Sequence, residues 1–231
     1  MLKLAIGNKN YSSWSMRPWV LLRHFGIPFD ELMLRFDSMA PGSAFKQAAL
    51  ALSPAGRVPV LLHGELAVWD TLAIAEYLAE YTAQHWPEHA LWPRDPAARA
   101  RARSLCAEMH SGFAALRNAC PMNIEAHLPA IGQRVLAEQP AVAADLARLV
   151  AMWRDALAAS GGPYLFGGFG IADAYFAPVA TRLRTYALPL PADVAGYVDR
   201  LLASPGVVAW VQGALAEQAF VAFDEPYRQG R

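Results

Sequence analysis

The sequence predicts a small α/β domain followed by an all-helical domain. Up to about residue 80, short apolar runs of strand length alternate with segments of helical periodicity. From Ala97 onward the chain is rich in alanine, its apolar residues recur at helical spacing, and no strand pattern or internal repeat is found. We therefore expect the α/β domain at residues 1–81, a linker at 82–96 and the helical domain at 97–231.

The α/β domain begins with a strand, a loop, a helix and a second strand. Residues 2–6 are an apolar strand, and residues 15–25 form a helix that Gly26 ends, because glycine adopts the left-handed conformation readily. The second strand covers 29–34, and this order with short joints predicts a right-handed parallel crossover. The domain is completed by a helix at 43–51, a strand from Val58, a turn at His63-Gly64, a strand at 65–68 and a helix that starts at Asp70 or Thr71.

The helical domain is expected to consist of helices that prolines and glycines separate. In the preceding linker, Trp86 and Trp92 are expected to pack against a neighbouring surface. The predicted helices cover residues 97–119, 141–160, 171–188, 192–203 and 206–217.

The charge balance, the cysteines and the apolar runs of the sequence exclude several classes of function. Twenty basic and twenty acidic side chains give a net charge of zero, so no basic patch is expected for nucleic acid or an anionic membrane. The two cysteines, Cys106 and Cys120, lack metal-ligand spacing; no metal is expected, and unpaired thiols are consistent with a reducing cytoplasm. No apolar run is long enough for a signal-peptide core or a membrane span, so we expect a soluble cytoplasmic protein.

The loop before the first helix carries three serines, Ser12, Ser13 and Ser15, followed by Arg17. A serine oxygen can accept a hydrogen bond from a free N–H of a first helical turn, so a helix cap is the simplest interpretation. The alternative is that one of these serine hydroxyls takes part in catalysis. A hydroxyl that donates to a thiolate, helped by the helix dipole, lowers the pKa of a thiol from its reference value of about 8.5 and generates a nucleophile.

Two further points can belong to a binding site. Pro59 cannot donate to a sheet ladder; if its bond to Val58 is cis, the backbone of Val58 is free to pair with an extended peptide. A trans proline at a strand start is the alternative. Asp70 and Thr71 stand at a helix N-terminus, where free N–H groups and the helix dipole bind a carboxylate, and Asp70 can receive an ammonium. Simple capping is the alternative there.

These motifs occur in the order found in cytosolic glutathione transferases. The serine loop, SPAGRVPVL and DTLAIAEYL resemble their thioredoxin-like glutathione-binding domain, and LFGGFGIADAYFAPVA resembles their all-helical C-terminal domain. The resemblance covers nearly the whole chain. The loop is most similar to the serine-type zeta class (maleylacetoacetate isomerase-like): Ser12 and Ser13 match its two serines, Trp14 replaces its cysteine, and Arg17 matches its arginine.

The resemblance implies a glutathione-dependent enzyme. Glutathione is then the co-substrate, and Ser12, with Ser13 as the second choice, hydrogen-bonds its sulfur. Arg17 belongs to the same catalytic motif. The thiolate would add to a small hydrophobic or electrophilic molecule, and the enzyme would be a homodimer.

Five residues are implied to bind glutathione. Val58, next to Arg57 and a cis Pro59, pairs through its backbone with the cysteinyl part. Asp70 and Thr71 bind the γ-glutamyl group. Two other functions stay open: glutathione-dependent cis-trans isomerisation of a maleyl-type diacid, and a non-catalytic interaction protein with the same fold.

The second-substrate pocket is expected between the serine loop and the first long helix. Met109, Phe113 and Leu116 are candidates to line it, with His110 and Arg117 at its rim; core packing is the alternative for the first three. Other residues that the resemblance singles out are Arg182 and Arg184, near an arginine that zeta enzymes hold for an acidic substrate, and Asp173, a structural aspartate that ties a helix start to the preceding turn.

Overall fold

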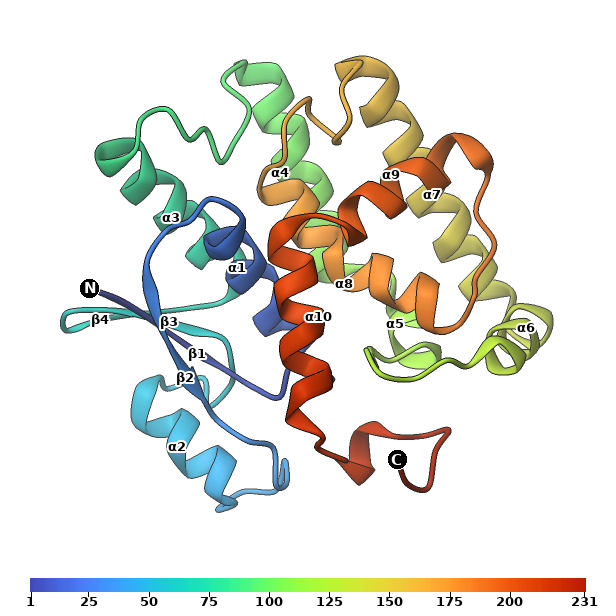
Figure 1. The fold of residues 1–231 in the computed structure, drawn as a ribbon, viewed down its shortest axis with the longest axis horizontal. Coiled ribbons are helices and arrows are strands. Elements are labelled where there is room, and N and C mark those ends of the chain that lie inside the picture. Colours follow the sequence, from blue (N-terminus) through green and yellow to red (C-terminus); the bar gives the residue numbers. More distant parts are fainter.

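A four-stranded mixed sheet forms the centre of the N-terminal unit of this computed structural model, which describes all residues from Met1 to Arg231 (Figure 1). The strand order is β2-β1-β3-β4. β1 pairs in parallel with β2, as predicted, and antiparallel with β3, which forms the predicted hairpin with β4. The strands are β1 (Leu2–Ile6), β2 (Phe29–Met33), β3 (Val60–His63) and β4 (Leu66–Trp69).

Three helices belong to this unit: α1 (Ser13–His24), α2 (Ala44–Leu52) and α3 (Thr71–His85). Eight residues of α1 are buried, because the helix packs against α8 and α10 of the helical unit. α3 continues past the boundary expected at Tyr81, where the rings of Tyr81 and His85 stack with centroids 4.1 Å apart. The α/β architecture agrees with the prediction.

The second unit is helical, and α10 runs along its boundary with the sheet unit (Figure 1). A single cluster of 53 buried residues extends through both units, so they share one apolar core. The helices are α4 (Pro96–Ser111), α5 (Ala114–Ala119), α6 (Pro129–Glu138), α7 (Pro140–Ser160), α8 (Ile171–Thr185), α9 (Ala192–Leu202) and α10 (Pro205–Glu217).

Two helix predictions are wrong in this unit. The helix expected over 97–119 is broken between α4 and α5, because Phe113 adopts a left-handed conformation (φ +57°) that turns its ring into the core. α6 is absent from the prediction. It begins at Pro129, a favourable residue for a first helical turn, and Gly132 lies so close to the carbonyl of Tyr186 that no side chain fits there.

After α10 the chain forms a segment that we call the C-terminal strap, residues 218–231. It contains a short 3₁₀ turn, Ala222–Asp224, and lies next to the loop that leaves β1 (Figure 1). No sequence pattern predicted this position.

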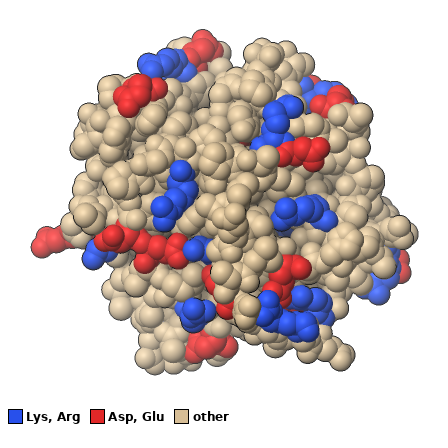
Figure 2. All heavy atoms as spheres, viewed as in Figure 1, with Lys and Arg blue, Asp and Glu red and all other residues tan.

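Charges of both signs are interspersed on the surface seen in Figure 2. None of the helices combines the length and apolar character that a bilayer-crossing segment needs. Cys106 and Cys120 are both buried and unpaired, as expected.

Candidate active site

Two adjoining cavities lie beside the serine loop. One, the helix-side cavity, has a volume of about 310 Å³ and the other, the loop-side cavity, about 440 Å³; they share Trp14, Arg57 and Val58. The helix-side cavity is also lined by Ala55, Pro59, Trp69, Asp70, Thr71, His110 and Arg117. The loop-side cavity is also lined by Tyr11, Ser12, Ser13, Phe36, Met39, Phe45, Lys46 and Asp224.

The structure brings seven of the eight expected site residues to these cavities, and Arg17 is the exception. Ser12 and Ser13 lie on the loop side, Asp70 and Thr71 on the helix side, and Val58 on both. The two cavities together have the size of a ligand site for a small peptide and a second small molecule.

A tight turn presents Ser12. The N–H groups of Tyr11 and Ser12 both donate to the carbonyl of Asn8, at 3.1 and 2.8 Å. Ser12 is the residue before the first turn of α1, yet its hydroxyl caps no N–H group. Its Oγ instead lies 2.7 Å from Ser15 Oγ, which accepts the N–H of Gly7 at 3.1 Å. The side chain of Ser12 is therefore available for a role other than capping.

Ser15, one of the three serines considered as a helix cap, does not cap α1. The helix begins at Ser13, so Ser15 lies inside the first turn and is fully buried. A hydroxyl has one hydrogen and can accept two hydrogen bonds. Ser15 Oγ therefore accepts from both the Ser12 hydroxyl and the N–H of Gly7, and the Ser12 hydroxyl must rotate away from Ser15 before it can donate to a ligand.

Arg17 lies beneath the cavities, with only 2% of its surface exposed. Its Nε donates to the carbonyl of Tyr175 at 3.1 Å, and its guanidinium carbon lies 3.9 Å from the ring centre of Trp14. Nη1 has no hydrogen-bond partner in the protein. Burial lowers the pKa of Arg17 to about 9, so the side chain still carries its charge at neutral pH. Arg17 lines neither cavity itself and contacts Trp14, which lines both.

The bond between Val58 and Pro59 is cis, as the resemblance implies. β3 begins only at Val60, and neither the N–H nor the C=O of Val58 makes a hydrogen bond within the protein. Since Val58 lines both cavities, an extended ligand can pair with this free backbone.

At the start of α3, three helices converge. Asp70 has a φ of +76°, which is uncommon for a residue other than glycine, and its Oδ1 accepts the N–H of Leu72 at 2.8 Å. Its Oδ2 lies 3.3 Å from His110 Nε2 on α4. Tyr175 of α8 completes the group: its hydroxyl is hydrogen-bonded to Thr71 Oγ1 and lies 3.2 Å from His110 Nδ1.

His110 and Arg117 line the helix-side cavity, as expected. The other three candidates, Met109, Phe113 and Leu116, are core residues instead. Arg117 lies with its guanidinium carbon 4.8 Å from the ring centre of Trp14, and it has no carboxylate partner: Nη1 donates to the carbonyls of His110 and Gly112. Burial lowers the pKa of Arg117.

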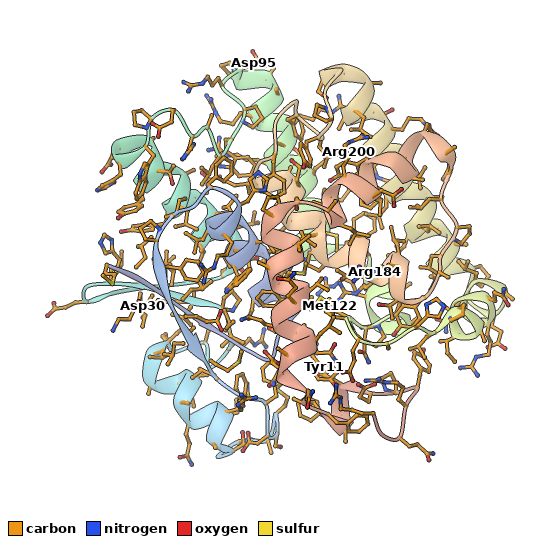
Figure 3. All side chains as sticks on the ribbon, viewed as in Figure 1. Tyr11, Asp30, Asp95, Met122, Arg184 and Arg200 are labelled. Carbon is orange, nitrogen blue, oxygen red and sulfur yellow. The ribbon has the colours of Figure 1, made fainter.

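The two arginines of α8 lie away from both cavities. Arg182 is buried and donates to the carbonyls of Cys120 and Pro178, and Arg184, labelled in Figure 3, is exposed and lines neither cavity. Sequence reasoning also missed Tyr175 and Asp224. Tyr175 contacts the cavity residues Thr71 and His110, but its IADAYF stretch carries no sequence signal for these contacts. Asp224 lines the loop-side cavity from the strap.

Asp224 makes the stability depend on pH. Burial, followed by the charge of Glu225, raises the pKa of Asp224 to about 6, and its carboxylate has no hydrogen-bond partner. The folded state therefore binds this proton more tightly than the unfolded state. The resulting stabilisation is complete below about pH 4 and is lost as the pH rises through 6.

Asp224→Asn is therefore expected to be more stable than the wild type at pH 8, by about 1–2 kcal/mol after allowance for solvent screening. At pH 3.5 the two proteins should differ little. Urea unfolding at both values measures this. An equal free-energy difference at the two pH values would contradict the expected titration.

The chain belongs to the glutathione S-transferase family. Residues 11–81 match the family model described as the glutathione S-transferase N-terminal domain, and residues 96–213 match the C-terminal domain. The fold is accordingly the glutathione transferase fold that the sequence predicted.

Similar proteins include a glutathione transferase homolog from Burkholderia GL BGR1, solved with bound glutathione; it is 28% identical with a TM-score of 0.69, over 93% of this chain and 98% of that one. "Maleylacetoacetate isomerase" of Pseudomonas aeruginosa is 34% identical over 126 residues, 53% of this chain and 55% of that protein. "Glutathione S-transferase 1" of Dianthus caryophyllus is 30% identical over 121 residues, 52% of each chain. The chain spans about half the length of these curated relatives.

Proposed function

We propose that the protein is a serine-type glutathione transferase. It binds glutathione across the two cavities and activates the thiol for addition to a small electrophile. The observation that carries the proposal is the convergence of three groups: the Ser12 hydroxyl, the free backbone of Val58, and the start of α3 at Asp70 and Thr71. The Burkholderia relative, solved with glutathione, supports it.

The ends of glutathione find complementary groups in this site. The carboxylate of Asp70 suits the γ-glutamyl ammonium, and the N-terminus of α3 with the Thr71 hydroxyl suits its carboxylate. In the loop-side cavity, Lys46 and Arg57 supply positive charge for the second carboxylate of the tripeptide. Val58 then pairs with the peptide between them.

The thiol is activated by Ser12. Its hydroxyl, which donates to Ser15 Oγ in the structure, turns to donate to the sulfur, while Ser15 stays held by the N–H of Gly7. A hydrogen bond to a charged group contributes about 1.5–3 kcal/mol, and one pKa unit corresponds to about 1.4 kcal/mol. The thiol proton leaves to solvent. The thiolate forms the new S–C bond as the π bond of the electrophile breaks, and the electron pair of that bond takes up a proton from solvent. Trp14 in place of a cysteine means that the loop offers no protein thiol.

The proposed organisation is a glutathione-binding domain over 1–81 and a helical domain over 97–231, joined by 82–96, of which the first residues continue α3. We also propose a homodimer. Its support is the exposure of Leu66 and Trp69 on β4, 48% and 45%, because large exposed apolar side chains are common at subunit contacts.

Calorimetric titration of the protein with glutathione tests the proposal, together with retention on glutathione resin. Binding with an ultraviolet signal for the bound thiolate near neutral pH is the expected result. Failure to bind would contradict the proposal and favour a non-catalytic interaction protein.

A second candidate function is isomerisation of a maleyl-type diacid. It is favoured by Arg117, a half-buried cation in the helix-side cavity without a carboxylate partner, and by the likeness to a maleylacetoacetate isomerase. An acidic second substrate would supply the missing negative charge.

Arg117→Met is expected to lower kcat/KM for a carboxylate-bearing electrophile about 10–100-fold, the equivalent of a lost charged hydrogen bond, and to change it little for a neutral one. Turnover of maleylacetoacetate and of a neutral acceptor measures the contrast. Arg184→Met, which removes an exposed arginine outside the cavities, is the control. An equal loss with both electrophiles would rule out charge recognition by Arg117.

A further inference from the structure

The loop that presents Ser12 is held by residues from the other end of the chain. Glu217, the last residue of α10, accepts the side-chain amide of Asn8 at 3.1 Å and the backbone N–H of Lys9 at 2.9 Å. Trp210 Nε1 donates to the carbonyl of Lys9 at 3.0 Å. The first half of the loop is therefore fixed by α10.

The second half of the loop is held by the C-terminal strap. The hydroxyl of Tyr11 has two acceptors within reach, Glu225 Oε1 at 2.7 Å and the carbonyl of Ala219 at 3.2 Å. The same hydroxyl accepts the N–H of Val221 at 3.3 Å. Figure 3 shows Tyr11 at the lower end of α10, where the strap begins. Three polar partners of this hydroxyl, at residues 219, 221 and 225, belong to the strap.

Glu225 is itself fixed by several donors. It is 6% exposed, and its Oε2 accepts Asn123 Nδ2 at 2.8 Å and Arg228 Nε at 2.9 Å. Asn123 in turn accepts the side chain of Asn10 at 3.0 Å. The carboxylate thus connects both Tyr11 and Asn10 to one buried network. A buried carboxylate with this many donors holds its geometry closely.

These contacts matter for Ser12 because the turn is short. The N–H groups of Tyr11 and Ser12 share the carbonyl of Asn8 as acceptor, so a displaced Tyr11 moves Ser12 with it. Burial raises the pKa of Tyr11 to about 12, so its hydroxyl remains a donor over the whole working range.

We propose that the C-terminal strap is a positioning element of the glutathione site, in which Glu225 acts through the Tyr11 hydroxyl to aim Ser12 at the sulfur. The inference depends on the proposed function. Neither residue touches the reacting atoms; both are positioning residues. By linkage, a ligand that binds the ordered loop also orders the strap.

The test compares Tyr11→Phe, Glu225→Gln and the double variant. Tyr11→Phe keeps the ring and leaves Glu225 bound to Asn123 and Arg228. The control is Arg154→Gln, which breaks an Arg–carboxylate pair with Asp193 on the far helices α7 and α9. For each protein, the pKa of the bound glutathione thiol, the dissociation constant and the melting temperature are measured.

Each single change is expected to weaken glutathione binding about 3–10-fold and to raise the pKa of the bound thiol. The double variant should lose little more than either single one, because both act on the same contact. In the wild type, hydrogen exchange over residues 218–231 should slow when glutathione binds. Arg154→Gln should match the wild type in binding and thiol pKa.

The outcomes separate the two proposals. A wild type that does not bind glutathione overturns the proposed function and this inference together. This inference alone is overturned if three results occur together. The wild type binds glutathione, the variants lower only the melting temperature, and hydrogen exchange in the strap is the same with and without glutathione. The hydrogen-exchange experiment uses the wild type alone, so it tests whether the strap is coupled to glutathione binding even if Glu225→Gln does not fold.

Discussion

Replacing Ser12 by alanine is expected to raise the pKa of the bound glutathione thiol by about one to two units. The change removes one charge-assisted hydrogen bond to the sulfur, worth about 1.5–3 kcal/mol, and each pKa unit corresponds to about 1.4 kcal/mol. At neutral pH the thiolate fraction then falls, and kcat/KM should fall about 10–100-fold. Above the raised pKa most of this loss should be recovered, because hydroxide removes the proton instead.

The measurement is the ultraviolet absorbance of the bound thiolate as a function of pH, together with the pH profile of kcat/KM. Ser13→Ala is the matched control, since it removes a neighbouring hydroxyl in the same cavity. A raised pKa in Ser13→Ala with none in Ser12→Ala would transfer the role to Ser13. An unchanged pKa in both would exclude thiol activation by this loop.

The general fold was predictable because its signals are local. The apolar runs of β1 and β3 and the periodicity of α3 lie in short stretches, and the proline after Val58 is a local mark of a strand entry. Helix boundaries were less reliable. α4 and α5 were predicted as one helix, since only the core that receives Phe113 reveals the break.

The site was predictable in part for the same reason. Ser12, Val58 and Asp70 each stand at the end of a strand or the start of a helix, where free backbone and polar side chains are expected. The residues that hold their neighbours come from distant parts of the chain and have no local signal. Tyr175 of α8 contacts Thr71 and His110, and Glu225 of the strap accepts the Tyr11 hydroxyl.

Arg17 and Ser15 illustrate a second limit. The sequence places both near the serine loop, but the rotation of α1 decides which side chains meet a ligand. Because α1 packs against α8, the side chain of Arg17 points to Tyr175 and lies under Trp14. Ser15 lies inside the same helix turn and accepts the N–H of Gly7. Motif matching gives the residue types, and only packing gives their direction.

Asp173→Ala is expected to have the largest effect on stability, with a loss of about 3–5 kcal/mol in the free energy of unfolding. Asp173 is 1% exposed and accepts three hydrogen bonds: the N–H of Leu165 at 3.2 Å, the N–H of Gly170 at 3.0 Å and the hydroxyl of Tyr197 at 3.1 Å. Alanine leaves these buried donors without a partner, and each unsatisfied group costs about 1–3 kcal/mol.

Urea unfolding at one pH measures this loss, and Asp193→Ala is the control. Asp193 is an acidic residue at the start of α9 whose pair with Arg154 is exposed to solvent, so its loss should cost little stability. Equal losses in the two variants would mean that the buried hydrogen bonds contribute little. The position also matters for the site: Asp173 fixes the start of α8, and two residues further Tyr175 binds Thr71 and faces His110. Asp173→Ala should therefore weaken glutathione binding in the molecules that remain folded, whereas Asp193→Ala should not.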